Sequence, residues 1–177
     1  MSSTSPRQSP LIRKNEGVFL AQGPVVRLSD ESTRELVEGL AGSEKGRVRI
    51  CAHADSKDRL HEMIIALARG SYIQPHRHLD KAESFHLIEG RLDIVLFDEA
   101  GNVTETIALA PYGNAEGLPF YYRLNAPIYH TVIVRTPHTL FHETTSGPFV
   151  PGDAEFAAWA PAPEDGAAAL RFLARFD

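Results

Sequence analysis

Alternation of apolar and polar residues dominates the middle of the chain. Residues 47–51 alternate strictly, and further short segments rich in apolar residues lie at 60–67, 83–88, 91–97, 102–109, 121–124, 129–135 and 139–144. Short segments of this kind, separated by turn residues, predict β-strands, and residues 18–20 predict one more. Residues 98–101 form the polar loop of a predicted hairpin.

Helical patterns are confined to the two ends of the chain. Residues 29–40 predict a helix with Leu36, Val37 and Leu40 on its apolar side, and Ser32 with Glu35 matches a capping box. Residues 150–163 contain three prolines and predict a return loop, and residues 166–176 predict a final helix. Many strands with helices only at the ends indicate an all-β fold, an antiparallel barrel or sandwich with short helices packed outside.

The length of the chain, 177 residues, suits one domain with a sizeable core. Residues 1–15 are rich in serine, proline and charge and predict a disordered tail. We therefore expect a single domain over residues 16–177, with the core of the barrel at about 47–150.

Composition excludes several classes of function. The net charge is -5 and the basic residues are not clustered, so nucleic acid is not an expected partner. Cys51 is the only cysteine, which excludes an internal disulfide and a thiolate-rich zinc site. Residues 1–10 lack the apolar centre of a signal peptide, and no apolar run is long enough to span a membrane. A cytoplasmic protein without a membrane partner is the expectation.

The histidines point to a metal site. All 8 lie between His53 and His142, and residues 70–90 fit the pattern G-x5-H-x-H-x4-E-x6-G. His76 and His78 project from the same face of a strand, where two imidazoles can converge on one ion. The four residues before Glu83 suffice for a turn that returns its carboxylate to the same place. We expect one divalent ion, either Fe, Mn, Ni, Co or Zn.

This segment resembles the first sequence motif of the cupin superfamily, whose mononuclear members bind metal through three histidines and one glutamate. The resemblance implies a double-stranded β-helix, or jelly-roll, barrel. It also implies a third histidine at the start of a later strand, and His130 fits that position. The second cupin motif is matched only in part, because Pro127 and Val134 occupy its glycine and asparagine positions. His142 is therefore the alternative to His130.

Residues 20–160 resemble, more narrowly, the WbuC-type cupin-fold metalloproteins. The resemblance rests on Arg49-x-Cys51-x-His53, on residues 61–63, 75–78 and 83–86, and on the closing Gly-Pro-Phe at 147–149. It implies an association with bacterial surface-polysaccharide (O-antigen) biosynthesis and leaves the reaction open.

Four further residues are candidates for contact with a small-molecule ligand. Arg49 and His53 share one face of a strand, so Arg49 is a candidate for holding an anionic group and His53 for proton transfer. Should that face point outward, both belong to an ordinary solvated edge. Glu143 is a second candidate for proton transfer, and His142 a second candidate for substrate binding.

Four protein ligands leave one or two open positions on a five- or six-coordinate ion. These open positions, together with the surface-polysaccharide association that the resemblance implies, lead us to expect an enzyme that uses the metal as a Lewis acid on a sugar or a sugar-derived keto acid, with isomerase or epimerase chemistry. An iron-dependent dioxygenase and a non-catalytic, metal-dependent binding module are the alternatives. Cupins frequently pair by sheet extension, so a homodimer is expected.

Overall fold

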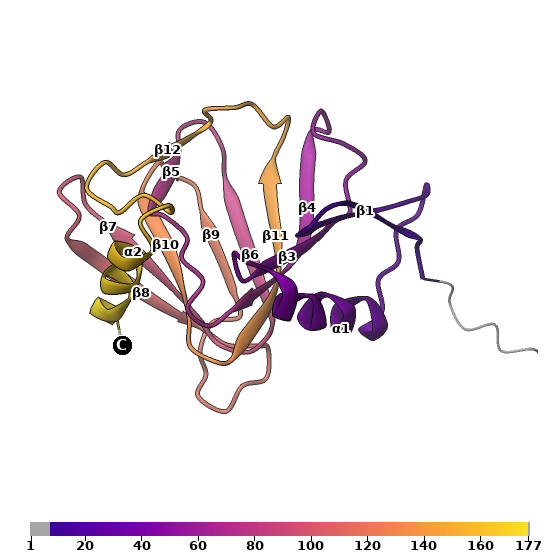
Figure 1. Ribbon diagram of the computed structural model, residues 1–177, viewed down its shortest axis with the longest axis horizontal. Coiled ribbons are helices and arrows are strands. Elements are labelled where there is room, and N and C mark those ends of the chain that lie inside the picture. Colours follow the sequence, from indigo (N-terminus) through magenta and orange to yellow (C-terminus); the bar gives the residue numbers. More distant parts are fainter. Residues whose placement is uncertain (1–7, 177) are drawn as a thin grey trace, which may run out of the picture.

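Twelve strands form two sheets in the computed structural model, which describes residues 8–176 (Figure 1). The seven-stranded sheet has the order β1-β2-β3-β4-β11-β6-β9, and the five-stranded sheet has the order β12-β5-β10-β7-β8. All pairings are antiparallel except that of β2 with β3. The strands are β1 (Leu11–Asn15), β2 (Val18–Ala21), β3 (Arg47–Cys51), β4 (Leu60–Ala68), β5 (His76–His78), β6 (Glu83–Glu89), β7 (Leu92–Phe97), β8 (Val103–Leu109), β9 (Tyr121–Leu124), β10 (Tyr129–Val134), β11 (His138–Ser146) and β12 (Ala154–Phe156).

The main core lies between the two sheets. Alternate residues of each strand turn inward, as the period of two requires. Leu92 and Ile94 of β7 are fully buried there, against Leu67 of β4 and Leu87 of β6. Two facing antiparallel sheets are the arrangement of a jelly roll, so the prediction of an all-β fold is confirmed.

Each sheet carries a helix on its outer face. The helix α1 (Asp30–Gly39) packs on the seven-stranded sheet through Leu36, which is 1% exposed. The helix α2 (Gly166–Leu173) packs on the five-stranded sheet through Phe172, at the opposite side of the molecule in Figure 1. Short 3-10 turns follow both helices, η1 (Leu40–Gly42) and η2 (Ala174–Phe176). Neither helix in residues 8–176 has the length and apolar character needed to cross a lipid bilayer.

The predicted capping box is wrong in its position. The N-cap of α1 is Ser29, and its backbone N–H donates a hydrogen bond to the Ser32 hydroxyl over 3.0 Å. Ser32 is thus the third residue of the box rather than the first. A hydroxyl three residues after the cap reaches the cap N–H in the same way as a glutamate does.

Two strands lie where the sequence predicts no strand. β1 pairs with β2, although residues 11–15 fall in the predicted tail. Residues 1–7 lie outside the described residues, so the division into a tail and one domain stays a prediction. β12 interrupts the predicted return loop and pairs with β5, placing Phe156 opposite His76. Neither strand has a clear alternating pattern, because both are short edge strands that bury only part of their side chains.

Candidate metal centre

The two sheets meet at a cluster of four ligand-bearing side chains, His76, His78, Glu83 and His130. Their ligand atoms all lie within 4.8 Å of one another. Two ligands about 2.1 Å from one ion, on opposite sides of it, stand about 4.2 Å apart, so the cluster is close to the required size. The three histidines belong to the five-stranded sheet and the glutamate to the other.

Strand pairing brings the histidines together. His130 of β10 lies directly opposite His76 of β5, and their ring centroids are 4.6 Å apart. His78, two residues farther along β5, points to the same side, with its ring 5.8 Å from that of His130. From the facing sheet, Glu83 places its carboxylate oxygens 3.3 Å from Nε2 of His78 and 3.2 Å from Nε2 of His130.

Backbone carbonyls orient two of the imidazoles. Nδ1 of His76 lies 3.0 Å from the carbonyl oxygen of Gln74, and Nδ1 of His130 lies 3.0 Å from that of Ile128. A carbonyl oxygen can only accept, so each Nδ1 carries the proton and each Nε2 presents a lone pair. Hydrogen bonding of the distal ring nitrogen to a backbone carbonyl is the usual support of a metal-binding histidine.

Two buried atoms in the cluster lack a hydrogen-bond partner within the described residues. Nε2 of His130 and Oε1 of Glu83 face each other but do not have the geometry of a hydrogen bond. Both residues are almost fully buried, with exposures of 1% and 5%. A cation between the two atoms would satisfy both, since each offers a lone pair. The donor set therefore fits a divalent ion.

The electrostatics of the cluster favour the metal-binding protonation states of Glu83 and His76 and oppose that of His130. Burial opposes ionisation of Glu83, but its contacts with His130 and His78 hold its pKa below the usual range. Burial lowers the pKa of His76 to about 4, helped by the neighbouring His130. Burial also acts to lower the pKa of His130, but the Glu83 carboxylate outweighs this effect and raises it. Near neutral pH the cluster thus offers a carboxylate and a neutral imidazole at position 76.

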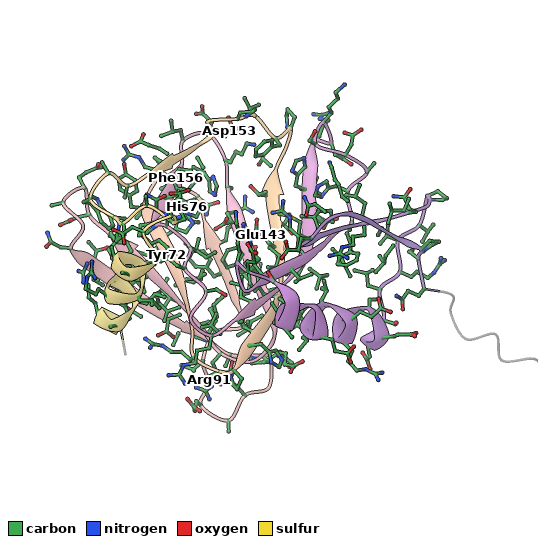
Figure 2. All side chains as sticks on the ribbon, viewed as in Figure 1. Tyr72, His76, Arg91, Glu143, Asp153 and Phe156 are labelled. Atoms are coloured by element: carbon green, nitrogen blue, oxygen red, sulfur yellow. The ribbon has the colours of Figure 1, made fainter. Side chains whose placement is uncertain are left out.

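A cavity of about 500 Å³ opens beside the cluster and is lined by His78. Three of the other predicted site residues also line it: Arg49 and His53 at one side, and Glu143 from β11. Figure 2 shows Glu143 near the centre of the molecule, with His76 and Phe156 together to its left. This size is within the range of about 300–1,000 Å³ of small-molecule sites.

Glu143 has no ion-pair partner among residues 8–176, but charges of both signs act on its carboxyl. Burial raises the pKa of its carboxyl to about 8, the Glu83 charge adds to the increase, and Arg49 and Arg47 oppose it. The carboxyl thus lies near the cluster on one side and near two guanidinium groups on the other. A carboxyl that titrates near neutral pH suits proton transfer.

His53 stacks on a second histidine, His61, that also lines the cavity. Its ring lies parallel to that of His61, with centroids 4.2 Å apart, and burial lowers the pKa of His53. Cys51 also lines the cavity, and burial raises the pKa of its thiol, so the thiol stays protonated. Its chemistry is that of a small buried side chain and not of a nucleophile.

His142 is not brought to the cluster. His142 of β11 lies opposite Ile64 of β4 and His86 of β6, and its Nε2 lies 3.7 Å from a carboxylate oxygen of Glu62. Because Glu143 points to the cavity, its neighbour in the strand must point to the opposite face. The alternatives in which His142 replaces His130 or binds substrate are therefore at odds with the geometry.

The sequence did not single out two inward-facing polar residues: Arg47 was not a site candidate, and Tyr122 was expected only as a residue of the barrel wall, like Tyr121 and Tyr129. Arg47 is two residues before Arg49 in β3, so the same alternation places both side chains on one face of the strand. Tyr122 is 7% exposed, and its hydroxyl is buried without a hydrogen-bond partner in the described chain. Burial raises the pKa of this hydroxyl, and the charge of Glu83 adds to the effect. No local pattern distinguishes it from Tyr121, whose side chain is exposed.

A family model described as a domain of unknown function, DUF6016, matches residues 28–109. No curated protein matches the chain.

Three solved structures resemble part of this chain in three dimensions. Protein SO0799 from Shewanella oneidensis is 20% identical, with 59% of this chain and 66% of that chain covered and a TM-score of 0.48. The Schizosaccharomyces pombe Cnp3 cupin domain is 8% identical, with 58% and 66% covered and a TM-score of 0.44. A sugar phosphate isomerase from a cupin superfamily, from Silicibacter pomeroyi, is 18% identical, with 51% and 52% covered and a TM-score of 0.40. This chain therefore spans 52–66% of the length of these three proteins.

Proposed function

We propose that this chain is a metal-dependent enzyme that moves a proton on a sugar or a sugar-derived keto acid, as an isomerase or epimerase does. The observation that carries the proposal is the convergence of His76, His78, Glu83 and His130 beside a cavity of about 500 Å³ that His78 lines. A divalent ion bound there supplies Lewis-acid polarisation to adjacent carbonyl and hydroxyl oxygens.

The chain's own residues supply the other requirements of such a reaction. Glu143 lies inside the cavity without an ion-pair partner in residues 8–176, so its carboxyl is free to exchange a proton with a bound ligand. His53 lines the same cavity and is the second candidate for this role. The apolar residues Val18, Leu20 and Met63 also line the cavity.

The biological setting and the assembly belong to the proposal as well. The resemblance to WbuC-type proteins supports a substrate from bacterial surface-polysaccharide metabolism. We include a homodimer formed by sheet extension, because β9 and β1 are sheet edges in the described chain.

Deuterium exchange tests the proposed reaction. Protein loaded with Mn²⁺, Co²⁺ or Zn²⁺ is incubated in D₂O with aldoses, ketoses and sugar acids, and proton NMR follows the C–H next to the carbonyl. We expect exchange or a new isomer with the wild type, and a loss of at least about 100-fold with Glu143→Gln, within the range for a general acid–base group. Glu105→Gln, on an exposed part of β8, is the matched control.

The alternatives appear as distinct outcomes of the same experiment. Product formed only in the presence of dioxygen would identify oxygen-dependent chemistry. Fully metal-loaded protein that leaves every C–H unexchanged, but is stabilised against heat by a sugar, would be a binding module. Either result would overturn the proposed proton transfer.

A further inference from the structure

Two arginines lie side by side on the inner face of β3. Arg47 pairs with Leu67 and Arg49 with Ile65, and both partners belong to the core between the sheets. Residues two apart in a strand point to the same side, so both arginines face the interior. Each guanidinium lies close enough to the other that Arg49 lowers the pKa of Arg47, after burial, which lowers it more.

Neither arginine has a carboxylate partner in the part of the chain that the structure describes. The partly buried Arg77 pairs with Glu155 over 2.8 Å, and Arg135 pairs with Asp93 over 2.7 Å. By contrast, Nε of Arg49 is buried and makes no hydrogen bond with any described residue. The charge of Glu143 acts on both partly buried arginines, but it forms no ion pair with either in the described chain, so a bound anion would supply the missing partner.

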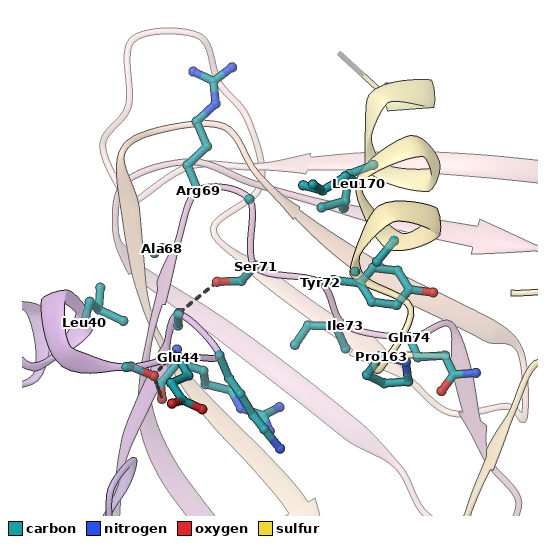
Figure 3. Close-up of a pocket in the computed structure, with 18 of the residues that line it drawn as sticks. Leu40, Glu44, Ala68, Arg69, Ser71, Tyr72, Ile73, Gln74, Pro163 and Leu170 are labelled. Carbon is teal, nitrogen blue, oxygen red and sulfur yellow. Dashed lines mark hydrogen bonds between the residues drawn. The ribbon is translucent and has the colours of Figure 1, made fainter. Parts of the chain in front are cut away.

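Both arginines line space that reaches the metal centre. Arg49 lines the cavity of about 500 Å³ together with His78. Arg47 lines a second, outer cavity of about 770 Å³, which also reaches His76. Figure 3 shows this second cavity between the end of α1 and the helix α2, with Tyr72 among its lining residues. Ala154 and Phe156 line both cavities, so the edge strand β12 lies between them.

The two arginines, Glu143 and Glu83 lie on strands that follow one another across the seven-stranded sheet. In the order β3-β4-β11-β6, the arginines belong to β3, Glu143 to β11 and the metal-ligand candidate Glu83 to β6. Adjacent strands are about 4.8 Å apart, so about 14 Å separates the backbones of β3 and β6 across the sheet. Along the strands, Arg49 is level with Leu87, four residues from Glu83, and Arg47 lies two residues farther on. The charges of Arg47, Arg49 and Glu83 all act on Glu143, so a ligand beside Glu143 lies between the arginines and the metal centre.

We propose that the substrate is an anion, and that Arg47 and Arg49 bind its carboxylate or phosphate group at the end distant from the metal. This inference rests on the proposed function and adds the chemical class of the substrate. Arginine suits the role because its planar donors match both carboxylate and phosphate oxygens in pairs. The two arginines select an anionic substrate over a neutral one, and Glu143 remains the group that exchanges the proton.

Calorimetry with matched pairs of sugars tests this inference on full-length protein loaded with Co²⁺. Glucuronate and glucose differ only in a carboxylate, and glucose 6-phosphate and glucose only in a phosphate. We expect either glucuronate or glucose 6-phosphate to bind at least about tenfold more tightly than glucose. The one that binds more tightly shows whether the arginines prefer a carboxylate or a phosphate. Inorganic phosphate alone measures the contribution of the anion without the sugar.

The double variant Arg47→Gln/Arg49→Gln should lose the preference, leaving at most about a twofold difference between the paired sugars. The visible spectrum of bound Co²⁺ shows whether the metal site of the variant is intact. Arg47→Lys/Arg49→Lys keeps the charges and should keep part of the preference. Arg91→Gln, whose arginine pairs with Glu116 on the surface, is the matched control and should behave as the wild type.

Two results would overturn the inference: a wild type without preference for either anionic sugar, or a double glutamine variant that retains the preference. Failure of the proposed function gives a different pattern. In that case the anionic sugar binds in an arginine-dependent manner, but its C–H bonds do not exchange with D₂O.

Discussion

The two ends of the space between the sheets are built from the same strands but have opposite character. At one end, Leu87, Leu92 and Ile94 are closely packed, with exposures of 0–1%. At the other end, the same faces of the strands carry His130 and Glu83, and two of their buried atoms have no hydrogen-bond partner in residues 8–176. Within β6 alone, the inward side chains change from Glu83 through Phe85 to Leu87.

This difference teaches how the molecule separates stability from chemistry. Burial of an aliphatic side chain contributes about 1.5–3 kcal/mol, so the apolar end stabilises the fold. A buried polar group without a partner costs about 1–3 kcal/mol, so the polar end destabilises the chain until a ligand arrives. Substitutions at the two ends should therefore have effects of different kinds.

The largest effect on folding is expected at the apolar end. Ile94→Ala removes a fully buried side chain and should lower the free energy of unfolding by about 2–5 kcal/mol, as measured by urea denaturation. Metal affinity of the folded variant should be unchanged. Ile88→Ala, at a position 43% exposed on β6, is the matched control and should change stability by less than about 1 kcal/mol.

At the polar end the effect should fall on metal binding. Glu83→Gln keeps the volume but removes the carboxylate that faces His78 and His130. We expect metal affinity, measured by calorimetry with Zn²⁺ or Co²⁺, to fall by more than about 100-fold, since loss of an outer-sphere partner alone costs about 10–100-fold. Glu89→Gln, on the same strand but exposed, is the control. Equal affinities of the two variants would contradict the metal site.

The pH dependence of stability provides a further test of the polar end, at Glu143. Its pKa is raised from about 4.5 to about 8 by burial and by Glu83, so between these values the folded metal-free chain holds a proton that the unfolded chain has released. Stability from this group is therefore complete below pH 4.5 and is lost as the pH rises through 8.

Glu143→Gln should remove that decline, and the variant should be more stable than the wild type at pH 8.5 by about 1–3 kcal/mol relative to their difference at pH 4.5. Urea denaturation of both proteins across this range measures the difference. Parallel stability curves for the two proteins would show that Glu143 titrates as an ordinary exposed carboxyl.

The smallest effect is expected at the border between the two ends. Tyr122 packs in the apolar cluster, but its hydroxyl is buried without a partner among the described residues. Tyr122→Phe should raise the free energy of unfolding of the metal-free protein by about 1 kcal/mol, because it removes an unsatisfied polar group and keeps the ring. A decrease of similar size would mean that the hydroxyl does have a partner in solution.

The sequence predicted the central strands and both helices because each has a clear period along the chain. Its errors among the strands fell on β1 and β12, which are short edge strands without alternation. In the candidate site, the spacing of His76, His78 and Glu83 indicated three members of the cluster from one local segment. The sequence also left open whether the face of β3 that carries Arg49 points inward.

What the sequence determined by itself is which side chains share a face, since this depends only on the period of two along a strand. The tertiary structure alone decided that His130 lies opposite His76, that Glu143 and Arg49 line the same cavity, and that β12 closes the sheet beside β5. These relations depend on the register between distant strands. Register is set by how the whole core packs and by the length of the connecting loops, and no single segment of the chain encodes it.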